Sequence, residues 1–327
     1  MNKKKLAIII GLIVTMIAAV FIINRLFFGV SQTEVGKIVF IVNRNQTEDQ
    51  TLDKLKNQGL IRNKIAFKMV LYLKGKQAIE SGGYIVSKNM RAWQLAGKLA
   101  SAPDMKWVVI PEGLRKEQIG ETLAKTFAWS NDELEKWNTE YTKMRIDYLE
   151  GTYFPDTYLI PVSEGGFDIA QRMTRRFDEK FAPYISQFAE QNILWTTGLK
   201  LASIIQREAG GKDDMLLIAG ILWNRLNQGM NLEIDATVQY ARGKTDAGWW
   251  APIKSADITN IDSPYNTYKY KGLPPFPIAS PGIEAIEAVL HPTETACLYY
   301  LHDNNRQIHC AKTFDEHKAN IEIFLKR

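Results

Sequence analysis

The stretch LKLASIIQREAGG, residues 199–211, has the pattern of a buried helix that carries one carboxylate. Four residues fall at positions i, i+3, i+4 and i+7, namely Leu201, Ile204, Ile205 and Glu208. A helix places all four on one stripe. Burying an ionised carboxylate is costly, so its pKa normally rises. A carboxylic acid that stays protonated near neutral pH suits a general acid, which makes Glu208 a candidate for that role.

The same letters are also compatible with an ordinary helix end. Glu208 closes the apolar run, two glycines follow it, and Lys212 lies at i+4. A frayed terminus with a surface ion pair between Glu208 and Lys212 has this pattern. This stretch alone leaves both interpretations open.

Helical patterns surround this stretch from about residue 114 to 230. Residues 169–191 are amphipathic, and we expect Pro183 to break that helix. Residues 214–230 form a second apolar stripe, which predicts a helix that packs beside the first, with Glu208 near their shared end. Residues 283–292 predict a short helix that stops at Pro292.

Residues 262–282 contain five Pro and two Gly together with several aromatic residues. Such a segment is rigid but irregular. Its aromatic rings suit the wall of a cleft for sugars or peptides, or they clamp the loop to its own core. The adjacent Trp249 and Trp250 raise the same two alternatives.

Three segments of the N-terminal third repeat one pattern, a short β-branched run followed by an amphipathic helix. They are residues 37–60, 81–101 and 105–127. Strand–helix units of this kind predict one or two compact α+β modules. The fold class is therefore α+β, with a mostly helical second part.

The N-terminal region predicts a single membrane-spanning helix. Residues 6–23 carry no charge, and apolar residues extend the run to 28. Eighteen or more uncharged residues can span a bilayer. The lysines at 3–5 then place a cytoplasmic tail at 1–5 and the rest of the chain outside, after a linker at 29–37.

Composition and charge exclude some classes of function. The net charge of +5 on 327 residues is mild and spread along the chain, so no nucleic-acid partner is expected. Cys297 and Cys310 flank a predicted strand–turn–strand and are either a cross-strand disulfide or two buried thiols. The four histidines are His291, His302, His309 and His317. Their spacing matches no zinc-binding pattern, so no metal site is predicted.

Five stretches of the chain resemble the MltG/YceG family, the membrane-anchored endolytic murein transglycosylases. They are IPEGLRKEQIGETLA (110–124), LEGTYFPDTYLIP (149–161), LASIIQREAG (201–210), IAGILWNRLNQGMNLEIDATVQYARG (218–243) and SPYNTYKYKGLPPFPIASPGIEAIEAVLHP (263–292). The likeness covers roughly residues 110–320, with the motifs in the same order. QIHCAKTFDEH near the end departs from the family pattern at Ile308 and Cys310, so His309 and His317 receive no role.

The resemblance implies a LysM-like module at 38–109 and a catalytic domain at 110–327. It implies an enzyme that cuts peptidoglycan glycan strands between MurNAc and GlcNAc and leaves 1,6-anhydroMurNAc ends, with Glu208 as its catalytic residue. No cofactor is expected. Substrate-binding residues are expected among the motifs, at Glu150, Asp235, Gln239, Tyr265, Asn266, Thr267 and Tyr268. The expected location is the extracytoplasmic side of the bacterial cytoplasmic membrane, where the enzyme is expected to cut nascent strands beside peptidoglycan synthases and so terminate strand elongation.

Two rival functions follow from the same residues. A second carboxylate near Glu208, such as Glu150 or Asp235, would activate water and make the protein a hydrolase. An adaptor that binds the cell wall without cutting it is the other rival.

Overall fold

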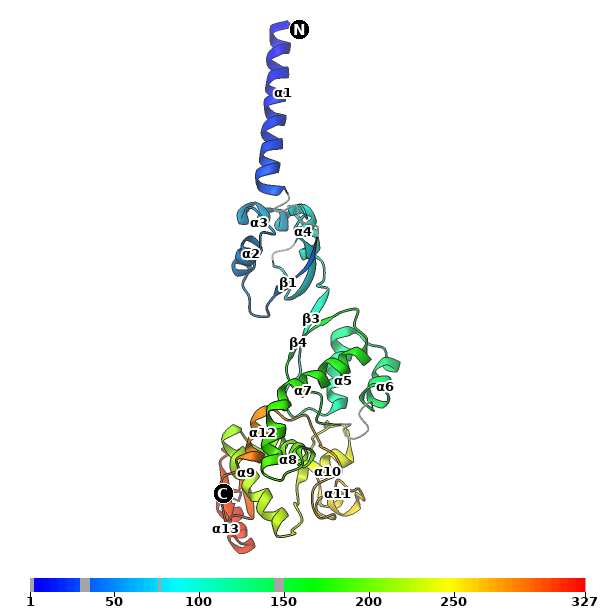
Figure 1. Ribbon diagram of the computed structural model, residues 1–327, viewed down its shortest axis with the longest axis vertical. Helices are drawn as coiled ribbons and strands as arrows, with labels where there is room; N and C mark the ends of the chain where they lie inside the picture. The colour runs from blue at the N-terminus through cyan, green and yellow to red at the C-terminus, as the bar shows by residue number, and fades with distance from the viewer. Residues whose placement is uncertain (1–2, 30–35, 76–77, 144–149, 327) are drawn as a thin grey trace. The chain divides into compact units, whose positions relative to one another are not determined.

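The computed structural model describes residues 3–29, 36–75, 78–143 and 150–326. Its contacts divide the chain into two units (Figure 1). Unit 1 comprises Met1–Val108 and Tyr158–Glu164, and unit 2 comprises Val109–Thr157 and Gly165–Arg327. The chain thus leaves unit 1, returns to it for one strand, and leaves again.

Unit 1 is built on a four-stranded sheet with the strand order β1-β2-β3-β4. Its elements are α1 (Lys3–Ile23), a π-helix (Asn24–Phe28), β1 (Lys37–Val42), α2 (Glu48–Asn57), α3 (Lys64–Leu73), β2 (Gly82–Ser87), α4 (Ala92–Ala100), β3 (Met105–Val109) and β4 (Thr157–Pro161). β1 and β2 are antiparallel, with Lys37 opposite Ser87 and Val42 opposite Gly82. Apolar residues of β1, β2 and helices α2–α4 form one buried cluster, as the strand–helix pattern predicts. The LysM likeness of this unit stays a prediction.

The prediction of a membrane-spanning helix at residues 6–28 is wrong. Among the residues that the structure describes, no helix combines the length and the apolar character needed to cross a bilayer. The predicted span is not one α-helix: α1 ends at Ile23, and Asn24 and Arg25 begin the π-helix. The predicted linker at 29–37 falls mostly on residues 30–35, outside the described residues, as do residues 1–2 of the predicted tail.

Unit 2 is mostly helical. Its helices are α5 (Lys116–Phe127), α6 (Asn131–Thr139), α7 (Gly166–Glu190), α8 (Trp195–Glu208), α9 (Lys212–Asn227), α10 (Asp235–Arg242), α11 (Ser255–Asn260), α12 (Ile283–Leu290) and α13 (Phe314–Phe324), with a 3-10 turn at Tyr141–Lys143. α12 packs against both α8 and α9 (Figure 1). Leu201, Ile204 and Ile205 of α8 are fully buried in the resulting core, so the predicted apolar stripe is the centre of this unit.

Helix α7 continues through Pro183, where the sequence predicts a break. Proline removes one backbone hydrogen bond and crowds the preceding turn. Phe177, Phe181 and Phe188 lie on both sides of this point, are buried, and stack successively with ring centroids 4.9 and 5.8 Å apart. Packing of these rings on the core holds the two halves of the helix in line.

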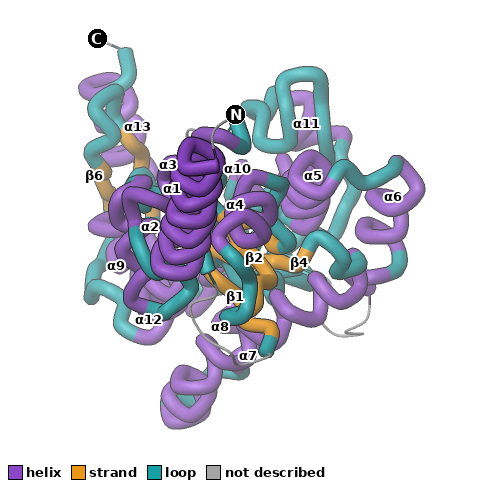
Figure 2. Tube along the Cα trace, turned by 90° about the horizontal axis from the view of Figure 1, so that it is seen from above, coloured by secondary structure: helices purple, strands orange, loops and turns teal. Residues whose placement is uncertain are grey.

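A two-stranded hairpin, β5 (Tyr299–His302) and β6 (Ile308–Ala311), precedes α13. Figure 2 shows β6 beside α13, and the two elements are in contact. Cys297 and Cys310 form a disulfide, which settles the alternative left open by the sequence. Residues 261–282 contain turns and no helix or strand, as their proline content predicts.

Candidate active site

Glu208 is the last residue of α8 and lines a cavity of about 510 Å³ in unit 2. The apolar stripe of α8 buries its first three members completely, whereas Glu208 is partly exposed where the stripe meets the cavity. Lys212 does not pair with Glu208, because its ammonium group contacts the Glu284 carboxylate. The structure therefore favours the functional interpretation of Glu208 over a frayed helix end.

The cavity is lined mainly by polar and aromatic side chains. Its walls are formed by Arg207, Glu208, Arg225, Glu233, Ile234, Asp235, Ala236, Gln239, Trp250, Tyr268, Tyr299, Tyr300, Phe314 and His317. They come from α8, α9, the segment between α9 and α10, α10, the two irregular loops after α10, strand β5 and α13. Four of the residues predicted from the sequence are among them: Glu208, Asp235, Gln239 and Tyr268.

The Glu208 carboxyl is held by two donors. The Tyr300 hydroxyl donates to Oε2 at 2.8 Å. The backbone N–H of Ala236, in the first turn of α10, donates as well. A helix N-terminus favours a negative charge, so this contact stabilises the ionised carboxylate that a general acid becomes after it has given up its proton.

The pKa of Glu208 is nevertheless raised above its usual value. Burial is the largest cause, and the negative charge of Asp235 adds to it. The Tyr300 hydrogen bond, the Ala236 N–H and the nearby His302 act in the opposite direction. Burial therefore outweighs the donors, and Glu208 keeps its proton to a higher pH than an exposed glutamate does.

Asp235 and Glu233 are the other carboxylates of the cavity lining, and Glu233 pairs with Arg225. The Tyr268 hydroxyl donates to Oδ1 of Asp235 at 2.6 Å, and the side-chain amide of Asn231 donates to the Tyr268 backbone oxygen at 2.7 Å. Burial and this bond to Asp235 raise the pKa of Tyr268, so its hydroxyl stays a neutral donor.

Asn266 and Thr267 do not line the cavity and instead hold its walls together. The Asn266 side chain is fully buried and donates to the backbone oxygens of Ile258 and Ile261. The Thr267 hydroxyl accepts the Ile234 N–H at 3.0 Å, immediately before α10 begins. The motif that contains them thus positions α10 and, with it, Asp235. Tyr265 packs against Tyr240 with ring centroids 4.8 Å apart and is likewise outside the cavity lining.

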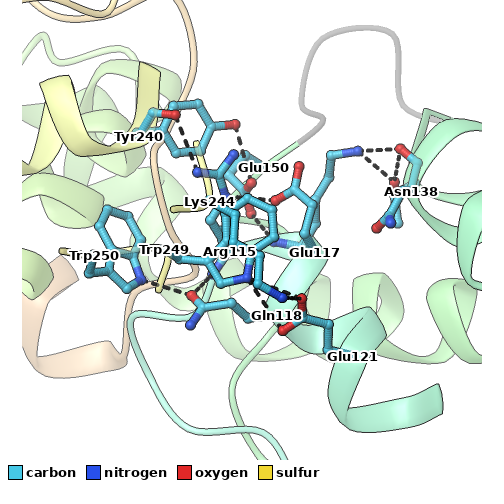
Figure 3. A network of polar contacts seen from close by, with 12 residues as sticks. Arg115, Glu117, Gln118, Glu121, Asn138, Glu150, Tyr240, Lys244, Trp249 and Trp250 are labelled. Atoms are coloured by element: carbon cyan, nitrogen blue, oxygen red, sulfur yellow. Dashed lines mark hydrogen bonds and ion pairs between the residues drawn. The ribbon is translucent and has the colours of Figure 1, made fainter. Parts of the chain in front are cut away.

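Glu150 belongs to a separate polar network, drawn in Figure 3. Its side chain is fully buried and accepts the Lys116 N–H at 2.9 Å and the Tyr240 hydroxyl at 3.3 Å. The Arg115 guanidinium lies between the rings of Tyr240 and Trp249, at 4.2 and 4.4 Å from their centroids. Burial raises the pKa of Glu150 to about 8, with a further contribution from Glu117 and opposition from Arg115. Glu150 is thus a buried acid of the scaffold.

The network of Figure 3 reaches the cavity through Trp250. The Trp250 indole N–H donates to the Gln118 side chain at 2.8 Å. The Arg207 guanidinium lies 4.0 Å from the centre of the same Trp250 ring and donates to the Gly113 carbonyl at 3.3 Å. Aromatic and guanidinium faces of this kind suit contact with a sugar or a peptide.

Sequence reasoning missed several of the residues that line the cavity, among them Arg225, Tyr299, Tyr300, Phe314 and His317. The hairpin and its turn were predictable, but no pattern within residues 297–317 indicates that this segment faces a helix end about 90 residues earlier in the chain. His302 and His309 pair with Asp214 and Asp303 at 3.0 and 3.1 Å. Among the described residues, no group of His, Cys, Asp or Glu side chains is arranged to hold a metal ion.

Comparison with known proteins identifies the family. A model of the YceG-like family matches residues 40–323, which is most of the chain. The chain belongs to the YceG-like family. An endolytic murein transglycosylase of Bacillus subtilis (strain 168) is 31% identical over 294 residues, which are 83% of this chain and 80% of that relative.

Other YceG-like relatives agree. An endolytic murein transglycosylase of Streptococcus pneumoniae (strain D39) is 29% identical over 300 residues, 82% of this chain and 54% of the relative. The chain therefore spans about half the length of the pneumococcal relative. The crystal structure of a protein described as YceG-like, from Listeria monocytogenes, superposes with a TM-score of 0.60 at 27% identity, covering 88% of this chain and 99% of that one.

Proposed function

We propose that this YceG-like protein is an endolytic peptidoglycan lytic transglycosylase with Glu208 as its acid and base. The observation that carries the proposal is the position of Glu208, at the end of a buried helix in a polar, aromatic cavity, with its pKa raised by burial. The names of the Bacillus and Streptococcus relatives support the same activity.

The proposed reaction uses one carboxyl twice. Protonated Glu208 donates its proton to the glycosidic oxygen, and the bond from MurNAc C1 to that oxygen breaks. The N-acetyl carbonyl of the substrate attacks C1 and relieves the positive charge that develops there. The Glu208 carboxylate then takes the proton of the MurNAc C6 hydroxyl, whose oxygen displaces the N-acetyl group and closes the 1,6-anhydro ring. Glu208 ends protonated, as it began.

The surroundings of Glu208 suit both steps. Burial raises the pKa of the carboxyl and so favours the protonated form that the first step needs. Tyr300 and the Ala236 N–H donate to the carboxylate that exists between the two steps. Tyr268, Gln239, Trp250 and Arg207 offer hydrogen bonds and ring faces to the glycan along the cavity.

Hydrolysis is the second candidate, and one observation favours Asp235 for it. Asp235 lines the cavity and its charge acts on Glu208. Glu150 is a poor candidate for this role, because it lies in the buried network outside the cavity lining. A hydrolase would use Asp235 to activate water and would leave reducing ends.

The product ends decide between these functions. The full chain is incubated with purified polymeric peptidoglycan, and the ends are identified by mass spectrometry. We expect anhydroMurNAc ends that are lost in Glu208→Gln, with a decrease of roughly a hundredfold or more, the scale of a general acid. Glu179→Gln, at an exposed position on α7, should leave activity unchanged.

Three other outcomes would contradict the proposal. Reducing ends that disappear in Asp235→Asn would establish the hydrolase. AnhydroMurNAc ends that persist in Glu208→Gln would show that another residue is the acid. Tight binding of peptidoglycan with no new ends would identify an adaptor.

We also propose an extracytoplasmic location. Peptidoglycan, the proposed substrate, lies outside the cytoplasm, and disulfides such as Cys297–Cys310 persist in oxidising compartments. Labelling of free thiols in protein taken from cells tests this: two unreactive cysteines are expected, and two reactive ones would contradict it. The expectation of action on nascent strands beside synthases rested on the membrane helix and is not carried forward.

A further inference from the structure

Strand β5 of the hairpin contacts the C-terminal end of α8 through Glu208 and the first turn of α9 through Asp214. Tyr300 and His302 are two apart on β5, so their side chains leave the same face of the strand. The Tyr300 hydroxyl donates to Oε2 of Glu208 at 2.8 Å. His302 Nε2 lies 3.0 Å from Oδ2 of Asp214, and the same oxygen accepts the Gly210 N–H at 3.1 Å. One strand therefore fixes both the carboxyl and the backbone just beyond it.

The hairpin is itself cross-linked beside Tyr300. Cys310 is directly opposite Tyr300 in the strand register, and it forms the disulfide with Cys297. The side-chain amide of Asn224, on α9, donates to the backbone oxygen of Cys297 at 3.2 Å. Covalent and hydrogen-bonded links thus tie the hairpin to itself and to the helix that follows α8.

From this geometry we infer that Tyr300 is a positioning residue for Glu208, and that the Cys297–Cys310 disulfide sets its position. The inference rests on the proposed function, in which Glu208 is the acid and base. Tyr300 is hydrogen-bonded to Oε2 of Glu208 and so fixes the orientation of the carboxyl at the cavity wall. The hydroxyl stays a donor throughout, because burial and the adjacent Glu208 raise the pKa of Tyr300 well above its ordinary value.

The direction of the pH effect follows from the groups that face Glu208. Asp235 of α10 raises the pKa of Glu208, whereas Tyr300 and His302 of β5 and the Ala236 N–H lower it. Within α8, Arg207 interacts electrostatically with Glu208. The negative charge of Glu208 also acts on the Tyr268 hydroxyl. Tyr300→Phe removes one donor to the carboxylate and so raises the pKa of Glu208 further.

The test compares the pH profiles of kcat/KM for the wild type and Tyr300→Phe on polymeric peptidoglycan. A general acid acts while it is protonated, so activity falls as pH rises through the pKa of Glu208. We expect that fall at higher pH in Tyr300→Phe. We also expect kcat lower by roughly tenfold or more, the scale of one hydrogen bond to a charged group, with KM little changed. A residue that only supports the fold would lower activity equally at every pH.

Tyr184→Phe is the matched control. The Tyr184 hydroxyl makes the same kind of bond, to the Glu287 carboxylate at 2.7 Å, outside the cavity. This variant should keep the wild-type kcat and pH profile. A wild-type profile and kcat in Tyr300→Phe would overturn the inference. Failure of the proposed function would instead be seen as anhydroMurNAc ends that persist in Glu208→Gln.

The double variant Cys297→Ser, Cys310→Ser tests the cross-link and serves if Tyr300→Phe does not fold. Circular dichroism first establishes that the double variant folds like the wild type. We then expect it to have a lower kcat and a pH profile shifted in the same direction as that of Tyr300→Phe. An unchanged kcat and profile would overturn the role of the disulfide. If Tyr300→Phe also fails to fold, the same unchanged result would overturn the inference as a whole.

Discussion

Two glutamates of unit 2, Glu208 and Glu150, show how surroundings decide what a carboxyl does. Glu208 lines the cavity of unit 2, and its donors are a tyrosine and a helix N-terminus. Glu150 is sealed in a polar network with Tyr240 and the Lys116 backbone. Burial raises the pKa of both. The helical spacing of apolar residues made Glu208 a candidate acid but left an ordinary helix end open, and the sequence around Glu150 did not distinguish a buried structural acid from a binding residue.

Glu150 should make the protein less stable as the pH rises. Its pKa is about 8 in the folded chain and 4.5 for an exposed glutamate. Between these values the folded chain holds a proton that the unfolded chain has lost. The free energy of unfolding therefore falls with pH across this window, by about 1.4 kcal/mol per unit at most. The variant Glu150→Gln keeps the neutral shape and should lose this part of the pH dependence.

Urea unfolding of the wild type and Glu150→Gln between pH 5 and 9 checks this prediction. The variant should gain stability relative to the wild type as the pH rises toward 8. Glu179→Gln is the exposed control and should follow the wild type. Parallel curves for wild type and Glu150→Gln would show that Glu150 is already ionised in the folded protein.

At the level of elements, α10 depends on a residue far away in the sequence. Its N-cap, Ile234, has no side-chain oxygen to offer, and the hydroxyl of Thr267 accepts the N–H of that residue instead. The same hydroxyl lies 2.9 Å from the hydroxyl of Thr237. A loop motif that the sequence associates with substrate thus acts by holding a helix. Since the partners are about 30 residues apart, no local pattern predicts this.

Thr267→Val should weaken this junction while keeping the shape of the side chain. It leaves the buried Ile234 N–H without an acceptor, which costs about 1–3 kcal/mol. Because Asp235 begins the helix, we also expect weaker glycan binding, seen as a higher KM. Thermal unfolding and steady-state kinetics measure the two effects. Thr139→Val, at an exposed position on α6, is the control, and a Thr267→Val variant that matches it in both would contradict the assignment.

The elements themselves were mostly predictable from periodicity, and the exceptions have physical causes. The three strand–helix segments and helices α8, α9 and α12 follow their apolar patterns. The predicted helix break at Pro183 is wrong, because aromatic packing on both sides of this proline outweighs one lost backbone hydrogen bond. The cavity wall at Tyr300 was not predictable, since it depends on a contact between β5 and the end of α8, which are separated by four intervening helices.

At the level of the whole molecule, the chain crosses between its two units more than once. Residues 158–164 belong to unit 1, although residues on both sides of them belong to unit 2. β4 lies in this returning segment and is the sheet neighbour of β3. Truncation of the chain after residue 108, where the first segment of unit 1 ends, therefore removes β3, the sheet neighbour of β4.

Two fragments that differ by seven residues test this arrangement. A fragment of residues 102–327 retains β3 (Met105–Val109), whereas one of residues 109–327 removes nearly all of it. We expect the shorter fragment to unfold at a lower temperature, because β4 loses its neighbour and exposes unpaired backbone groups. Limited proteolysis should cut it first within residues 157–164. Equal melting temperatures and equal cleavage would show that β4 is stable without β3.

The returning strand also has a consequence for synthesis on the ribosome. β4 begins about 50 residues after β3 ends, and a ribosome adds roughly 5–20 residues per second. For several seconds, therefore, the sheet of the first unit exists with β3 as an open edge, even though every other strand of that sheet has already been made. An open edge readily pairs with other chains. The nascent chain is therefore exposed to aggregation through this edge until β4 has been made. The number of residues between β3 and β4 sets the length of that interval.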